Sequence, residues 1–469
     1  MSAATSLAYA YRYPFASGLS MAGGLGGLRL ATSGGAAPNP HFFSGRLRYP
    51  REVADQLLTL SQVVASRFYL PGLARLVDPV VTANDGVLRF EGFSSCCGVY
   101  ARCDLSASAL DTDLHGRGTT NVDFNSAMRT ALSRVRADDK VALSVGAEHV
   151  TLAGNEGEVV EKKVALPVRW LKAFTEVQAY QPSLGLRFEI SVGEARQFVR
   201  SLPRGGGPRQ PSWVTPAGRG LRLSQRESKG AVRVMGTDRL RLMEGLMSGA
   251  QGLRVWDDPA TGTSAWEVLF RTGRFMLLIS PEVWRGFSGE GQALTALAGR
   301  DWEHALPRVR AELAWQARVD ANAVAGRTGL SRVQVDGALA VLGARGLVGY
   351  DISESAYFHR ELPFDLEAVE ALQPRLRDAR RLIAEGGLRV IERQDEGDQL
   401  TAIVMVPGTE VEHRVQLTPA ASGGDRCTCP WYAKNQGQRG PCKHVLAARL
   451  MIEGDDDTPT PGAPAAESK

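Results

Sequence analysis

The sequence has little cysteine and no long apolar run. Six cysteines in 469 residues are too few for the dense disulfide frameworks that hold small secreted domains together. No stretch approaches the roughly 20 apolar residues that a membrane-spanning helix needs. The first residues also lack the uninterrupted apolar core of a secretory signal, because Arg12 falls inside the only candidate stretch. These absences predict a soluble cytoplasmic protein without a disulfide scaffold.

The signature motifs of several large enzyme classes are also missing. The chain contains no Walker A motif, no G-x-S-x-G elbow, no H-E-x-x-H and no G-x-G-x-x-G after a predicted strand. Scattered His, Asp and Ser residues cannot be assembled into a catalytic site from one sequence, so a pocket without such a motif stays open. We therefore expect a binding protein and not an enzyme.

Acidic residues are scarce in two segments, although the net charge of the whole chain is only +4. Residues 1–51 contain five arginines and no acid, and residues 196–241 contain eleven basic residues against Glu227 and Asp238, a local excess of nine positive charges. Such a segment can follow a phosphate backbone, but an acidic protein would be attracted equally well. The candidate contacts to an anionic partner in this segment are Arg204, Arg209, Arg219, Arg222, Arg226, Lys229 and Arg233.

Three of the cysteines gather near the C-terminus in a pattern typical of metal ligands. Cys427-Thr-Cys429 is followed, after twelve residues, by Cys442-Lys-His444. Three thiolates and one imidazole suit tetrahedral Zn(II), and because they fill all four positions they predict a structural ion, one per chain, rather than a catalytic one. Lys434, Arg439 and Lys443 keep this region positive, so we also count them as candidate contacts to an anionic partner.

The segment before these ligands predicts the rest of a small module. A helix over 365–385 is followed by strands at 388–392, 400–406 and 411–417, and a second helix is expected at 442–452. The pattern Cys-x-Cys-x(n)-Cys-x-His after a β-meander resembles the SWIM zinc finger over residues 388–452.

Further stretches, at 88–100, 118–125 and 166–171, are similar to bacterial SWIM zinc finger family proteins over most of the chain. This resemblance implies zinc binding and a DNA-binding or protein-interaction role. It also implies an alternative function, an adaptor that serves a MoxR-type AAA+ ATPase together with a von Willebrand A protein.

A helix-turn-helix pattern precedes the zinc module. Ser331 can cap its third helix, and apolar residues such as Val335 and Leu339 give it an interior. That helix is expected to expose a mildly basic face, with Arg327 at the turn before it and Arg332, Gln334, Asp336, Val341 and Arg345 on the helix itself. DNA reading by this face and packing or protein contact both stay open.

The order of elements predicts a multidomain α+β protein, since 469 residues exceed what one hydrophobic core supports. The remaining cysteines, Cys96, Cys97 and Cys103, are expected to be buried and structural, because adjacent cysteines do not readily bind one ion. The expected segments are an irregular Gly/Ala-rich arm at 1–45, an α+β domain at 46–202, a basic Pro/Gly-rich linker or loop at 203–220, an α+β continuation at 221–300, a winged-helix-like segment at 301–360, the SWIM module at 365–453 and a disordered tail at 454–469.

Overall fold

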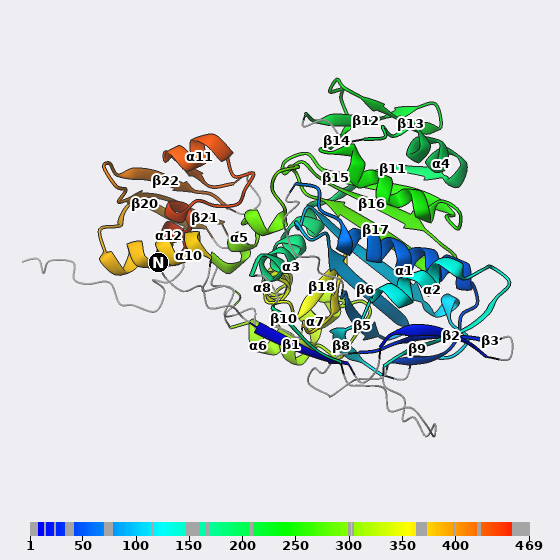
Figure 1. Ribbon diagram of the computed structural model, residues 1–469. Helices are drawn as coiled ribbons and strands as arrows, with labels where there is room; N and C mark the ends of the chain where they lie inside the picture. The colour runs from blue at the N-terminus through cyan, green and yellow to red at the C-terminus, as the bar shows by residue number, and fades with distance from the viewer. Residues whose placement is uncertain are drawn as a thin grey trace, which may run out of the picture. The chain divides into compact units, whose positions relative to one another are not determined.

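The chain forms two compact units in the computed structural model (Figure 1). Unit 1 comprises Met1–Glu290, Glu312–Val324 and Leu342–Leu366, and unit 2 comprises Gly291–Ala311, Ala325–Val341 and Glu367–Lys469. Helices and several separate sheets together confirm the predicted multidomain α+β class. The structure describes residues 8–13, 16–22, 25–32, 42–69, 78–114, 116–146, 160–165, 168–205, 210–298, 302, 304–362, 373–396, 399–419 and 424–452.

An eight-stranded antiparallel sheet is the centre of unit 1. Its order is β11-β15-β16-β17-β7-β6-β5-β8, so a late group of strands joins an early group where β17 pairs with β7. The strands are β5 (Val80–Asn84), β6 (Val87–Phe93), β7 (Val99–Ser106), β8 (Gly118–Asn121), β11 (Gly185–Ser191), β15 (Gly252–Asp258), β16 (Thr263–Leu269) and β17 (Gly273–Ile279). β5, β6, β7 and β16 are buried along nearly their whole length.

Helices and short turns complete the core around this sheet. The helix α1 (Pro50–Ala65) begins with a proline, which suits the first helical position, and packs against β6, β7 and α2 (Ser126–Arg134). The side chain of Asn125 caps α2 by accepting a hydrogen bond from the Met128 amide. The other helical segments of unit 1 are η1 (Ala107–Ala109), α3 (Val168–Tyr180), η2 (Gln181–Ser183), α4 (Val192–Ser201), η3 (Thr237–Leu246) and η4 (Phe287–Gly289).

The irregular arm expected at 1–45 is wrong, because the described part of this segment is largely strand. β1 (Ala8–Tyr13) pairs with β10 (Val160–Ala165), and a four-stranded sheet has the order β2-β3-β9-β4. Its strands are β2 (Gly18–Ala22), β3 (Leu25–Leu30), β4 (Phe43–Arg46) and β9 (Lys140–Val145). The glycines that suggest an irregular segment are tolerated in β3 because β9, more than a hundred residues later, supplies a parallel partner.

The basic linker or loop expected at 203–220 is wrong in its second half, from Ser212 onward. β12 (Ser212–Ala217) and β13 (Gly220–Ser224) begin inside it and form a three-stranded sheet with β14 (Val232–Val234), in the order β13-β12-β14. Pro216 is accommodated because β14 pairs only with 212–214, so Pro216 has a strand neighbour on one side. The segment also separates no domains, since β11 before it pairs directly with β15 after it.

A hairpin of β18 (Val348–Asp351) and β19 (Ala356–His359) is tied to the large sheet by a buried ion pair. Arg360 Nη1 lies 2.6 Å from Glu91 Oε1, and neither side chain is exposed to solvent. The Tyr100 hydroxyl donates a second hydrogen bond to the same carboxylate, at 2.5 Å. Glu91 is therefore charge-compensated inside unit 1.

The helices and strands predicted for the module at 365–453 are found in unit 2. α10 (Pro374–Glu385) is followed by β20 (Arg389–Glu396), β21 (Gln399–Val406) and β22 (His413–Leu417), and the chain ends in α12 (Lys443–Ile452). Two short elements not expected from the sequence are β23 (Arg426–Cys427), which completes the sheet order β20-β21-β22-β23, and α11 (Pro430–Asn435). α12 packs against α10 and β22. The tail expected at 454–469 lies outside the described residues.

The segment at 301–360 has the predicted order of helices and strands. α6 (Leu306–Ala311), α7 (Ala321–Thr328) and α8 (Arg332–Ala344) precede the β18–β19 hairpin, and α5 (Ala293–Ala298) lies just before them in sequence. α7 and α8 each have residues in both units. No helix in the described ranges is both long and apolar enough to span a membrane.

Candidate metal centre

The four predicted metal ligands come together in unit 2, each placed by a different local element. Cys427 ends β23, which is held beside β22 by the pairing of Cys427 with Val415. Cys429 is the N-cap of α11, and Pro430 occupies the first position of that helix. Cys442 directly precedes α12, and His444 lies in its first turn.

The distances within this cluster fit one tetrahedral ion. The ligand atoms of Cys427, Cys429, Cys442 and His444 all lie within 4.8 Å of one another, and all four residues are buried. Cys427 Sγ lies 3.8 Å from His444 Nδ1. Zinc bonds of about 2.3 Å to sulfur and about 2.0 Å to nitrogen place such atoms roughly 3.5 to 3.8 Å apart across a tetrahedron. The site therefore matches the size of a zinc centre.

Each of the three sulfurs also accepts a backbone hydrogen bond. The amide of Cys429 donates to Cys427 Sγ at 3.4 Å, that of Tyr432 to Cys429 Sγ at 3.3 Å and that of Val445 to Cys442 Sγ at 3.5 Å. The last two amides belong to the first turns of α11 and α12, where helix dipoles favour negative charge. The backbone thus stabilises thiolates at all three positions.

Hydrogen bonding and burial shift the pKa values of the three thiols in different directions. The hydrogen bond from the Cys427 thiol lowers the pKa of Cys442 to about 4 and raises the pKa of Cys427. Burial raises the pKa of Cys429. A divalent ion bound here would favour the thiolate form of all three sulfurs. The closed set of three sulfurs and one imidazole leaves no position for water, so the ion is structural.

Contacts of Arg375 and Gly440 hold the loop between Cys429 and Cys442 in place, and the sequence does not predict them; we call these contacts the clamp. Arg375 Nη1, on α10, donates to the carbonyls of Arg439 and Pro441, each at 2.8 Å, and its guanidinium lies 4.8 Å from the centre of the Trp431 ring. Gly440 has φ +75° and packs so closely that a Cβ there would lie 2.0 Å from the Gly291 carbonyl oxygen. The Gly440-Pro441 pair before Cys442 indicates a tight turn, but the residues that contact this turn, Arg375 and Gly291, lie far away along the chain.

The other three cysteines are buried, as expected. Within the described residues, the only cluster of His, Cys, Asp and Glu side chains with metal-binding geometry is the one at Cys427 to His444. Burial raises the pKa of Cys97 to about 12 and also raises the pKa of Cys103, so these thiols are neutral.

The predicted basic residues of 196–241 divide into two groups. Arg204 lies 3.9 Å from a Glu244 oxygen and Arg233 lies 3.3 Å from a Glu282 oxygen, so these two have carboxylate neighbours. Arg209 lies outside the described residues. The remaining four are exposed and form no ion pair with any carboxylate in the described ranges: Arg219, Arg222, Arg226 and Lys229. They lie on β13 and on the turns at either end of it.

The basic residues near the zinc ligands differ in their exposure to solvent. Lys434 is exposed on α11, while Arg439 and Lys443 are half-buried. Arg449, which also adds to the positive charge of this region, is paired with Asp425 at 2.6 Å.

The expected exposed face of the third helix is partly wrong. Val341 is buried, with no exposed surface. The Gln334 side chain accepts from the Ser331 amide while Ser331 Oγ accepts from the Gln334 amide, a reciprocal cap that confirms Ser331 as the start of the helix. Arg332 binds both carboxylate oxygens of Asp336, at 2.9 and 2.8 Å. Several of the predicted contacts on α8 are therefore already used within the helix.

Comparison with known proteins agrees with this geometry. Residues 413–452 match the family model of the SWIM zinc finger. The match spans β22, β23, α11, α12 and all four ligands, so this part of the chain is a SWIM zinc finger and its ion is zinc. Such fingers commonly mediate contacts with nucleic acids or proteins.

Other comparisons add little. No curated protein matches the chain. A chain in a crystal structure of the PCNA2-PCNA3 complex from Sulfolobus tokodaii is similar over 51% of this chain and 100% of its own length, with 8% identity and a TM-score of 0.34.

Proposed function

We propose that this protein is a non-catalytic, zinc-containing binding protein of the cytoplasm that associates with DNA. The observation that carries the proposal is the group of four exposed cations on and beside β13, namely Arg219, Arg222, Arg226 and Lys229, none of which pairs with a carboxylate in the described ranges. Cations that are not already paired can neutralise phosphates and release counterions, which is the main source of affinity for a DNA backbone.

The sheet that bears these cations also offers an aromatic side chain. Thr215 lies directly opposite Arg222, and Trp213, two residues before Thr215 on the same strand, shares that face. Trp213 is half-buried. An indole beside arginines suits contact with a deoxyribose or an unstacked base.

The finger supplies a second positive surface, and its zinc has a structural role. Arg426 and Lys434 are exposed near the ligands, while the ion itself is enclosed by three thiolates and an imidazole. A closed site does not activate water, which supports binding rather than hydrolysis.

The proposal is tested by fluorescence anisotropy with a labelled DNA duplex and the full chain, between 50 and 200 mM salt. Replacing Arg219, Arg222, Arg226 and Lys229 together by glutamine should weaken binding and reduce the slope of log K against log salt by up to about 3.6, since each phosphate contact contributes about 0.9. An Arg332→Gln/Arg345→Gln variant is the control. A larger loss of slope per removed charge in this control would place the contact on α8, and an unchanged slope in both variants would refute DNA association through these surfaces.

A protein-interaction role is the second candidate, and a specific feature favours it. β20 is an edge strand that pairs only with β21 in the described sheet, and its neighbouring residues Val390 and Ile391 are 43% and 53% exposed. An edge strand can accept a strand from a partner, and Val390 and Ile391, which lie at an irregularity in the β20–β21 register, add an exposed apolar contact there. The partner expected from the family resemblance is a MoxR-type ATPase or a von Willebrand A protein. Capture from native cells that survives nuclease and high salt, and that is lost when Ile391 is replaced by lysine, would favour this candidate over DNA.

A further inference from the structure

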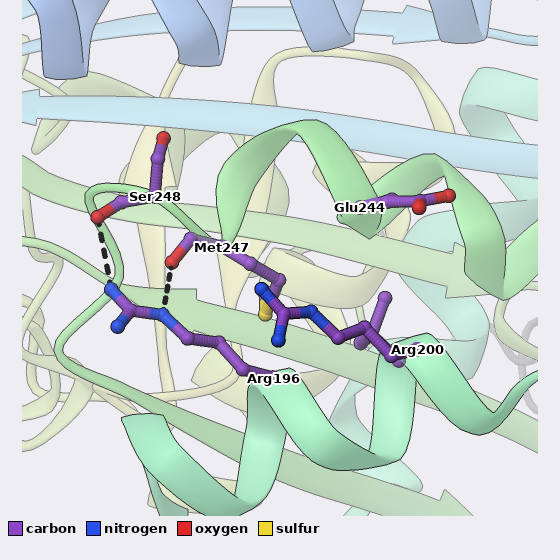
Figure 2. Close-up of a pocket in the computed structure, with 6 residues that line it drawn as sticks. Arg196, Arg200, Glu244, Met247 and Ser248 are labelled. Atoms are coloured by element: carbon purple, nitrogen blue, oxygen red, sulfur yellow. Dashed lines mark hydrogen bonds between the residues drawn. The ribbon is translucent and has the colours of Figure 1, made fainter.

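A cavity of about 480 Å³ opens between α4 and the chain that follows η3, in unit 1. It is lined by Arg196, Val199, Arg200, Glu244, Met247 and Ser248. In Figure 2 the side chains of Arg196 and Arg200 rise from α4 toward the segment that carries Met247 and Ser248. Its volume is within the range of small-molecule sites, roughly 300 to 1,000 Å³.

Two hydrogen bonds across this cavity hold the side chain of Arg196 in place. Arg196 Nε donates to the Met247 carbonyl at 2.7 Å, and Arg196 Nη2 donates to the Ser248 carbonyl at 3.0 Å. Both acceptors are neutral, so the positive charge of Arg196 is fixed in position without being compensated. A donor that is already immobile loses little conformational entropy when it binds a ligand.

The other arginine has no partner. Arg200 is exposed and makes no hydrogen bond or ion pair with any residue in the described part of the chain. It lies one turn after Arg196 on the same helix, where two like charges repel each other. An anion between the two guanidinium groups would relieve this repulsion.

The one carboxylate of the cavity is already paired with other cations. Glu244 Oε2 lies 2.5 Å from Arg241 Nη2, and Glu244 Oε1 lies 3.9 Å from Arg204. Asp55, which accepts a hydrogen bond from the Ser248 hydroxyl at 2.9 Å, is paired with Arg51 at 2.6 Å. The nearby acids therefore do not neutralise Arg196 and Arg200, and the cavity keeps a positive charge.

Two apolar residues also line the cavity. Val199 and Met247 are 1% and 7% exposed, so they belong to the core, and the groups that a ligand can contact here are the polar ones, chiefly the two arginines. We propose that this cavity binds the phosphate group of a small ligand, with the phosphate held by Arg196 and Arg200. Guanidinium groups match the oxygens of a phosphate through paired N–H donors. The site is independent of the proposed DNA contact, because it uses none of the same side chains.

Adenosine 5′-monophosphate is the probe, with adenosine lacking the phosphate and inorganic phosphate lacking the organic part. Isothermal titration calorimetry of the full chain should show binding of the monophosphate and of inorganic phosphate, and no binding of adenosine. Adenosine that binds as tightly as the monophosphate would overturn the assignment of the phosphate to the arginines. Absence of monophosphate binding would overturn the proposal itself.

Arg200→Gln should weaken binding of the monophosphate about 10- to 100-fold, the amount expected for losing hydrogen bonds to a charged group. The matched control is Arg134→Gln, which removes an exposed arginine from α2, outside the cavity, and should leave the affinity unchanged. Arg200→Glu should abolish binding, because its carboxylate would take the place of the anion beside Arg196. Equal effects of the Arg200 and Arg134 variants would show that only net charge matters and would refute the site. DNA affinity measured on the same variants should not change, which separates this proposal from the preceding one.

Discussion

Removing zinc should unfold the loop that carries the ligands while the rest of the finger module stays folded. The loop contains α11, a helix of six residues that has no buried residue. A helix this short is marginal in water, so it depends on the zinc bonds and the clamp around them. By contrast, β21 places Ala402, Val404 and Val406 in the core, and α12 packs against α10 and β22. These elements have apolar contacts that do not involve the ion.

The size of the effect follows from the arrangement of the ligands. Structural zinc contributes roughly 10 to 16 kcal/mol of apparent binding energy in zinc-finger peptides. Cys427 and Cys429, on the loop side, supply two of the four ligands, so opening the loop with zinc bound should cost at least about 4 kcal/mol, a thousandfold slowing of amide exchange. In the metal-free protein this contribution is lost, and the amides of α11 should exchange at nearly the rate of an unstructured chain.

Hydrogen exchange followed by mass spectrometry provides the assay. The full chain is compared before and after chelation, with metal loss checked by elemental analysis and zinc then added back to test reversal. The amides of Cys429 and Tyr432, which donate to the sulfurs, should lose protection, while amides of β16 in unit 1 serve as the control. Slow exchange of these loop amides after proven metal loss would refute the reasoning, and so would an equal loss of protection in β21.

Three further outcomes are expected. Elemental analysis of purified protein should find one zinc per chain and clearly less in Cys429→Ser and Cys442→Ser variants; unchanged zinc in both would contradict the ligand assignment. Nuclease, peptidase and phosphatase assays should show background turnover, because the closed ligand set has no position for an activated water; activity that disappears in a folded Cys427→Ser variant would contradict this. Arg360→Met should destabilise unit 1 by about 3 to 5 kcal/mol in urea unfolding, because Glu91 would stay buried without its cation, and adding Glu91→Gln should recover part of that loss; simple additivity of the two changes would contradict the pairing.

Much of the finger could be predicted from the sequence, because its signals are local. The spacing Cys427-x-Cys429 and Cys442-x-His444 determines the ligand set, and apolar periodicity predicts α12 and the end of α10 at nearly their observed bounds. The predicted start of the first helix, at 365, lies outside the described residues, and α10 begins at Pro374. Ser331 likewise predicts the start of α8, because a cap depends on residues within one turn of the chain.

Strand pairing and charge pairing were decided only by the tertiary structure. The glycine-rich segment β3 forms a strand because it pairs in parallel with β9, which lies more than a hundred residues away in the sequence. The sequence counts Arg204 and Arg222 as equal cations, yet only Arg204 has a carboxylate close by. Val341 belongs to a helix that the sequence predicts, but its burial depends on residues distant in the chain. Local sequence determines which conformation a segment prefers, whereas hydrogen bonds, ion pairs and burial between distant segments arise only when the whole chain has folded.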